Sequence, residues 1–149
     1  MPRKPPSFIN HPAKYEDVLK KGMFRCICHH VVDGDTADFL IDFGWNNFSY
    51  IALRFKGIDA PETRGTSGEV RRKALEAKET VEGLLLNKPC VIKSYKGRSF
   101  ERYMGEIWFY DVEGIYSTIP NSINISENEA GLWVSINQLL LFKELAVPS

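Results

Sequence analysis

The sequence has too few cysteines for a protein that disulfide bonds hold together. Only three are present among 149 residues, and an odd number cannot pair completely, which is typical of a reducing compartment. No apolar run approaches the roughly 18 residues that a membrane span needs. The positive charges near residue 1 are not followed by the apolar segment that a secretory signal contains. We therefore expect a cytoplasmic protein with no membrane partner.

The sequence also lacks net charge, because 19 Lys and Arg residues balance 19 Asp and Glu residues. These charges are distributed unevenly along the chain. Residues 106–149 contain one basic residue and six acids, whereas residues 64–102 contain ten basic residues and five acids. An anionic partner is therefore expected to bind the middle of the chain rather than its last third.

Length and composition fit one domain, with 44% hydrophobic residues for a core and 26% charged residues for a surface. Residues 1–22 are predicted to form an N-terminal arm with a short helix over 13–22. Residues 23–149 are the predicted folded domain, with an insertion at about 111–134 whose β-branched residues favour an extra hairpin.

Alternating apolar residues between turn signals predict five strands, at 23–32, 37–43, 48–58, 89–95 and 102–111. Apolar residues recur every three to four positions over 69–87, which predicts an amphipathic helix after the third strand. Residues 134–146 are expected to form a short final helix. This order predicts an α+β fold that is mainly β, a five-stranded barrel of the OB type.

Acidic residues occur at both ends of the predicted hairpin that precedes the helix. The sequence "DGDT" begins at Asp33, and "RFKGIDAPET" runs from Arg54 to Thr63. Alone, "DG" predicts only a turn, and an arginine on a strand is normally a surface residue. Aspartates from two strand ends that meet at one barrel mouth, however, would make an open site for a cation. We interpret Asp33 as a turn or supporting residue.

The stretch "CICHH" over 26–30 contains zinc-ligand residue types but has no second pair at suitable spacing. We interpret it as a strand, with Cys26, Cys28 and His30 on one face. Similarly, the aromatic residues at 108–110 are interpreted as core rather than as a platform for bases.

Five motifs in a fixed order resemble the staphylococcal nuclease (thermonuclease) family. They are "DGDT", "LRFKGIDAPET", a helix, "SFERYMGEI" and "NQLLLFKELAVP", and they cover roughly residues 23–110 and 134–147. The resemblance implies two sets of site residues. The implied metal ligands are the carboxylates of Asp35 and Asp59 and the backbone carbonyl of Ala60. The implied catalytic residues are Arg54, Glu62 and Arg102.

The chemistry of these residue types agrees with the implied roles. Carboxylate and carbonyl oxygens suit Ca²⁺, and also Mg²⁺ or Mn²⁺. Guanidinium groups stabilise charge that develops on a phosphate. A carboxylate such as that of Glu62 can take a proton from the attacking water or orient it, and the sequence leaves both open. Additional contacts to substrate are expected from Lys96, Arg98 and Arg71.

Two departures from the family pattern concern the substrate. Glu101 stands beside Arg102 where the family usually has glycine, and no stretch of these 149 residues is expected to match the family's C-terminal helix or its nucleotide-stacking tyrosines.

By resemblance, the predicted function is a Ca²⁺-dependent nuclease that hydrolyses phosphodiester bonds of DNA or RNA, with single strands favoured. Cleavage of the 5′ P–O bond would leave 3′-phosphate ends. The main alternative is a catalytically silent member of the family that binds nucleic acid or protein. A weaker one is an OB-type module that binds single strands passively.

Overall fold

A computed structural model describes residues 22–95, 103–124 and 131–149. Its elements are β1 (Met23–Asp33), β2 (Thr36–Asp42), β3 (Phe48–Phe55), β4 (Ile58–Asp59), α1 (Gly68–Leu85), β5 (Pro89–Tyr95), β6 (Tyr103–Asp111), β7 (Ile123–Asn124), β8 (Leu132–Ser135), α2 (Ile136–Phe142) and β9 (Val147–Pro148). The predicted arm over 1–22 and its helix lie outside these residues, apart from Gly22. Neither described helix is long and apolar enough to cross a membrane.

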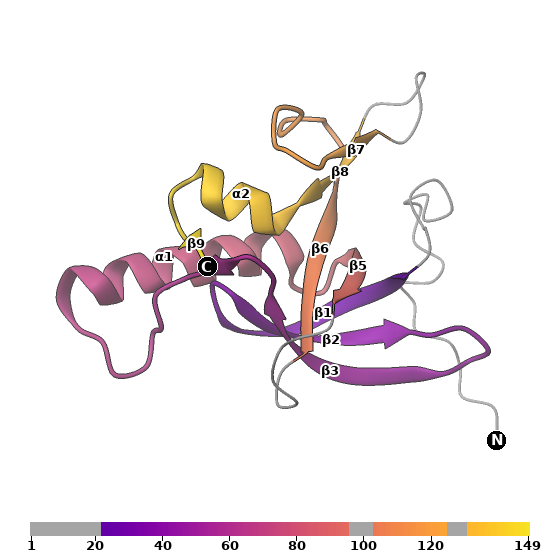
Figure 1. Cartoon of the computed structure of the whole chain (residues 1–149), viewed down its shortest axis with the longest axis horizontal. Coiled ribbons are helices and arrows are strands. Elements are labelled where there is room, and N and C mark those ends of the chain that lie inside the picture. The colour runs from indigo at the N-terminus through magenta and orange to yellow at the C-terminus, as the bar shows by residue number, and fades with distance from the viewer. Residues whose placement is uncertain (1–21, 96–102, 125–130) are drawn as a thin grey trace.

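The five predicted strands form a closed barrel. They follow the order β3-β2-β1-β5-β6 with antiparallel neighbours, and β3 then pairs with β6 in parallel to complete the ring. The closing contact is short, because it aligns only Leu53–Phe55 with Tyr103–Gly105. Helix α1 crosses one side of the barrel (Figure 1). The predicted fold, a mainly β barrel of the OB type within the α+β class, is confirmed.

Alternation decides which side chains of β3 enter the barrel. Leu53 and Phe55 are buried, whereas Tyr50 and Ala52 are exposed on the outer face. Arg54 lies on the same face of β3 as Tyr50 and Ala52, and it is partly exposed. This side-chain arrangement confirms the predicted strand pattern and places Arg54 outside the core, at the end of β3.

The α1 helix buries small residues against the barrel, with Ala74, Ala77, Val81 and Leu85 fully buried. Small side chains allow the helix axis to approach the strands closely. Val70 was expected to belong to this apolar face. It is instead 54% exposed, because it lies in the first turn before the helix reaches the barrel.

The structure differs from the predicted elements in several places. The third strand ends at Phe55 rather than at Ile58, because Gly57 has a φ of +81° and turns the chain. A β-bulge between Cys28 and His30 resets the alternation, so His30 is exposed while Cys26 and Cys28 are buried. The final helix starts two residues later than predicted, because β8 occupies 132–135.

The stretch after β6 lies beside β8 at the upper end of β6, whereas the β2–β3 hairpin extends to the lower right (Figure 1). Strand β8 pairs with both β6 and β7 in antiparallel fashion. Ile119 is buried in the main core, and Tyr116 contacts Phe109 edge-on at 5.9 Å. These contacts enlarge the barrel core with residues from the predicted insertion.

One buried amide fastens α2 to the barrel. The Asn137 side chain is 1% exposed, and its Oδ1 accepts a hydrogen bond from the Ile107 N–H at 3.1 Å. Its Nδ2 donates to the carbonyls of Lys56 at 2.9 Å and Gly105 at 3.1 Å. A single side chain therefore joins α2, β6 and the turn that leads from β3 into β4.

Replacing Asn137 with alanine is expected to lower the free energy of unfolding by at least about 2 kcal/mol, because each buried polar group left unpaired costs about 1–3 kcal/mol. Urea denaturation followed by circular dichroism measures the change. The neighbouring variant Gln138→Ala serves as the control and should change stability by much less. Equal effects of the two variants would contradict the role of the Asn137 amide.

Candidate functional site

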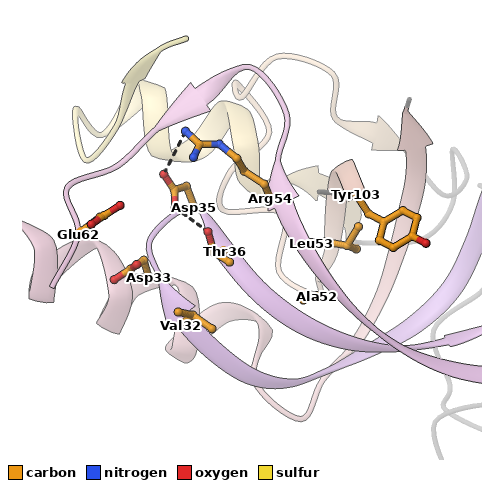
Figure 2. A pocket seen from close by; sticks show the side chains of 9 residues that line it. All are labelled: Val32, Asp33, Asp35, Thr36, Ala52, Leu53, Arg54, Glu62 and Tyr103. Carbon is orange, nitrogen blue, oxygen red and sulfur yellow. Dashed lines mark hydrogen bonds and ion pairs between the residues drawn. The ribbon is translucent and has the colours of Figure 1, made fainter. Parts of the chain in front are cut away.

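A pocket of about 280 Å³ opens where β3 meets β6 to close the barrel. Figure 2 shows Glu62, Asp33 and Asp35 grouped on one side of this pocket and Tyr103 on the other, with Arg54 between them. The residues that line it are Val32, Asp33, Asp35, Thr36, Ala52, Leu53, Arg54, Glu62 and Tyr103. Two of the predicted catalytic residues and one predicted metal ligand therefore share one pocket.

Among the described site residues with charged side chains, Asp35 is the most buried, at 4% exposure. Its Oδ2 accepts a hydrogen bond from the Ala60 N–H at 2.9 Å, and its Oδ1 accepts one from the Thr36 hydroxyl at 2.9 Å. Its backbone carbonyl accepts from the Phe55 N–H at 2.8 Å. Asp35 thus fixes the start of β2 to the end of β3 and to the loop that follows β4.

Arg54 lies between the two predicted metal carboxylates. Its Nη2 is 3.0 Å from Asp59 Oδ1 and 3.8 Å from Asp35 Oδ2. The Asp59 side chain is 57% exposed, whereas that of Arg54 is 25% exposed. Two acids that are 24 residues apart in the sequence therefore approach the same guanidinium nitrogen.

The position of Asp59 depends on the last strand of the chain. β9 pairs with β4 so that Val147 lies opposite Asp59, and the Ser149 N–H donates to the Gly57 carbonyl at 3.1 Å. Sequence analysis did not predict this strand, because a two-residue segment that contains proline carries no strand pattern. Asp59 and Ala60 also border a second hollow with residues 144–147.

Asp33 holds the loop that carries Glu62. Its Oδ1 accepts hydrogen bonds from both the N–H and the hydroxyl of Thr63, at 3.1 and 3.0 Å. Thr66 and Arg71 brace the same loop, because the Thr66 hydroxyl donates to the Glu62 carbonyl and Arg71 Nη1 donates to the Thr63 carbonyl. Glu62 itself is exposed at the pocket. The loop backbone is therefore held in place while the Glu62 carboxylate reaches solvent.

Gly34 explains why the acidic turn can lie so close to the helix. A Cβ at this position would be 2.6 Å from Ala77 Cβ and 3.1 Å from Ala60 Cβ. Both neighbours are themselves buried alanines, so neither can move aside easily. The glycine of "DGDT" therefore permits the close approach of the turn to α1 and to the residue after Asp59.

Three predicted residues, Lys96, Arg98 and Arg102, lie outside the described residues. Arg102 directly precedes Tyr103, which lines the pocket. Arg71 is described, and its hydrogen bond to Thr63 places it at the Glu62 loop.

The charge of the site is strongly acidic among the described residues. Asp33, Asp35 and Glu62 line the pocket, Asp59 contacts Arg54, and Arg54 is the only cationic side chain that lines this described pocket. The described carboxylates would therefore oppose an anionic group, and a bound cation would offset their charge.

The donor atoms suit a hard divalent cation. Each oxygen of Asp35 accepts one hydrogen bond and keeps a further lone pair, and the Asp59 carboxylate is open to solvent. Over the described part of the chain, no three His, Cys, Asp or Glu side chains gather as a metal site. A cation here would therefore take its remaining ligands from the backbone and from water, which Ca²⁺ and Mg²⁺ accept.

The cysteines take no part in this site. Cys26, Cys28 and Cys90 are fully buried and free. Burial raises the pKa of the Cys28 thiol to about 12 and holds the pKa of Cys26 well above its ordinary value. Since a metal binds the thiolate, the raised pKa values of Cys26 and Cys28 make these two thiols poor ligands.

Among the polar residues of the pocket, Tyr103 and Thr36 were not predicted as site residues. Tyr103 was counted only as part of a strand, although it is 65% exposed and sits opposite Leu53 in the closing strand pair. Thr36 was noted only as part of "DGDT", and its hydrogen bond to Asp35 was not predicted. The position of Tyr103 directly after the predicted Arg102 was the available signal.

Comparison with known families matches the central part of the chain. A family model described as "Staphylococcal nuclease homologue" matches residues 52–135, which is more than half of the sequence. The matched segment begins within β3, before Arg54, and ends with β8. Comparison with curated proteins gives no match.

Replacing Asp33 with alanine is expected to loosen the Glu62 loop, because the Thr63 N–H and hydroxyl lose their shared acceptor. Amide hydrogen exchange measured by NMR should show faster exchange at Thr63, while the core of β1 and β2 keeps its protection. Glu79→Ala, an exposed change on α1, is the control. An unchanged exchange rate at Thr63 would show that Asp33 does not hold the loop.

Proposed function

The chain belongs to the staphylococcal nuclease homologue family, and from this we propose that it is a metal-dependent nuclease acting on single-stranded DNA or RNA. Membership identifies a nuclease-like or nucleic-acid-binding domain. The observation that carries the finer proposal is the pair of carboxylates, Asp35 and Asp59, that converge on Arg54 beside Glu62.

The acidity of the pocket supports a bound cation. A phosphodiester carries negative charge, and the described carboxylates would oppose its approach. In the proposal, Asp35, Asp59 and the carbonyl of Ala60 hold Ca²⁺, with Mg²⁺ or Mn²⁺ as substitutes. When bound, the ion supplies a Lewis acid that neutralises charge on a phosphate oxygen.

The remaining groups have roles that follow from their chemistry. Arg54 donates hydrogen bonds from its planar guanidinium group to the phosphate. Arg102 is proposed as the second catalytic arginine. Glu62 is exposed at the pocket and accepts a proton from, or orients, the attacking water. The water oxygen forms a bond to phosphorus, the bond to the 5′ oxygen breaks, and that oxygen gains a proton. The products are a 3′-phosphate end and a 5′-hydroxyl end.

The first test concerns the metal. Purified protein should hydrolyse a single-stranded oligonucleotide in Ca²⁺ and lose this activity in excess EDTA, and renewed addition of Ca²⁺ should restore it. Gel analysis with phosphatase treatment identifies the 3′-phosphate ends. Equal cleavage with and without EDTA would refute the metal site. Binding of the oligonucleotide without cleavage in any divalent ion would favour the silent alternative.

The second test concerns Arg54. Losing one group that meets transition-state charge typically costs about 10²–10³-fold in rate, so Arg54→Ala should lower kcat/KM by that amount. Arg54→Lys keeps the charge but loses the planar fork, and should restore only part of the rate. Because Arg54 also separates two acids, thermal melts of both variants are needed to confirm folding. Full activity of a folded Arg54→Ala protein would remove this residue from the proposal.

A further inference from the structure

A further hollow, separate from the one beside residues 144–147, lies on the outer face of the barrel and adjoins the site. It has a volume of about 420 Å³ and is lined by His29, Asp38, Tyr50, Ile51 and Ala52. Ala52 also lines the pocket that contains Arg54, so the two hollows meet at this residue. A nucleic-acid strand bound at Arg54 can therefore continue into this hollow along the outer face of β3, past the exposed Ala52.

Tyr50 is placed as a platform in this hollow. It is 69% exposed, although aromatic side chains in strands normally pack. The His29 ring contacts it edge-on, with the ring centroids 4.8 Å apart and the planes at 75°. His29 thus supports the tyrosine ring from β1 and leaves most of Tyr50 in solvent.

The register of the strands gives the distance between this platform and the site. Arg54 lies opposite Thr36, Asp38 opposite Ala52, and Tyr50 opposite Leu40. Tyr50 and Arg54 are four residues apart on one face of β3, or about 13 Å at about 3.3 Å per residue. This equals about four nucleotides at the B-form rise of about 3.4 Å, and fewer if the strand is stretched.

The charge in the hollow selects what it can hold. The Asp38 carboxylate is half-buried there and takes part in no hydrogen bond or ion pair among the described residues. A carboxylate repels a phosphate but accepts hydrogen bonds from the amino groups of bases. The hollow therefore suits an uncharged base with N–H donors better than it suits the sugar-phosphate backbone.

We propose that this hollow is a nucleobase subsite, in which the Tyr50 ring stacks on a base of the strand whose phosphate lies at Arg54. This rests on the proposed function, because it extends the same substrate along β3. A stacking contact tolerates any base, and the Asp38 carboxylate adds a preference for bases that carry an amino group. The subsite gives longer single strands an advantage over fragments too short to reach Tyr50.

Binding and cleavage are measured separately to test this subsite. Fluorescence anisotropy in Ca²⁺ gives the affinity of the full chain for a labelled single-stranded octanucleotide and a labelled dinucleotide, both with nuclease-resistant phosphorothioate linkages. Hydrolysis of the same two sequences with ordinary phosphodiester linkages in Ca²⁺ gives KM and kcat. Tyr50→Ala removes the ring, Tyr50→Phe keeps it, and Phe142→Ala removes a similarly exposed aromatic ring from α2. Thermal melts establish that each variant folds.

Tyr50→Ala should weaken octanucleotide binding by about five-fold or more, the lower end of what base–aromatic stacking gives. The dinucleotide should lose much less, and the slope of affinity against salt should stay the same, because no phosphate contact is removed. Tyr50→Phe and Phe142→Ala should bind like the unchanged protein.

The outcomes separate the two proposals. If the protein hydrolyses the octanucleotide but Tyr50→Ala changes neither its affinity nor KM, the subsite is overturned and the nuclease proposal stands. A Tyr50 effect on binding without any hydrolysis would support the subsite and overturn the nuclease. An equal loss of affinity for the octanucleotide and the dinucleotide would overturn the subsite, since the effect would not depend on whether the ligand is long enough to contact Tyr50.

Discussion

The hydrogen bond between the Asp35 carboxylate and the Ala60 N–H connects the parts on which the site depends. A carboxylate that is 4% exposed is costly to bury unless its oxygens are paired. Here the Ala60 amide and the Thr36 hydroxyl each donate to one oxygen, and Arg54 lies 3.8 Å away. The buried carboxylate therefore has these partners only when the β1–β2 turn, β3 and the loop after β4 are all in place.

The same constraint determines the charge of the pocket. Because Asp35 must stay where the backbone and Arg54 can compensate it, its negative charge is fixed beside the exposed carboxylates of Asp59 and Glu62. Arg54 compensates only part of this charge, which leaves the pocket suited to a further cation. The outer face of β3 has a different character, since Tyr50 and Ala52 present an uncharged surface next to a single acid. In the proposal, the pocket at Arg54 takes the phosphate of one ligand and the outer-face hollow takes its base.

Local patterns in the sequence predicted most of the barrel. The period of two placed Arg54 outside and Leu53 inside, and the apolar spacing over 69–87 identified α1. The predictions were wrong where an irregular residue interrupts the pattern. The bulge after Cys28 moved His30 to the surface, and the turn at Gly57 shortened the third strand. Neither the bulge nor the turn changes the residue composition of its strand, so the period of two could not reveal them.

The predicted residues of the site came from the resemblance to the staphylococcal nuclease family, whereas their contacts required tertiary structure. Nothing in "DGDT" indicates that Asp33 accepts two hydrogen bonds from Thr63, which is 30 residues away. The pairing of β9 with β4 beside Asp59 was equally hidden, because two residues are too few to show alternation. Long-range hydrogen bonds of this kind depend on barrel closure, and closure is a property of the whole chain.

The measurement that tests the account most directly is paramagnetic broadening by Mn²⁺, which favours oxygen ligands. In an NMR spectrum of the full chain, substoichiometric Mn²⁺ is predicted to broaden the amide signals of Thr36, Ala60 and Asp59 first. Signals of Leu139 and Trp133, which lie in α2 and β8, should stay sharp. Selective broadening would place the cation between the two carboxylates. Uniform broadening, or none at these three amides, would contradict the central claim that Asp35 and Asp59 form a divalent cation site.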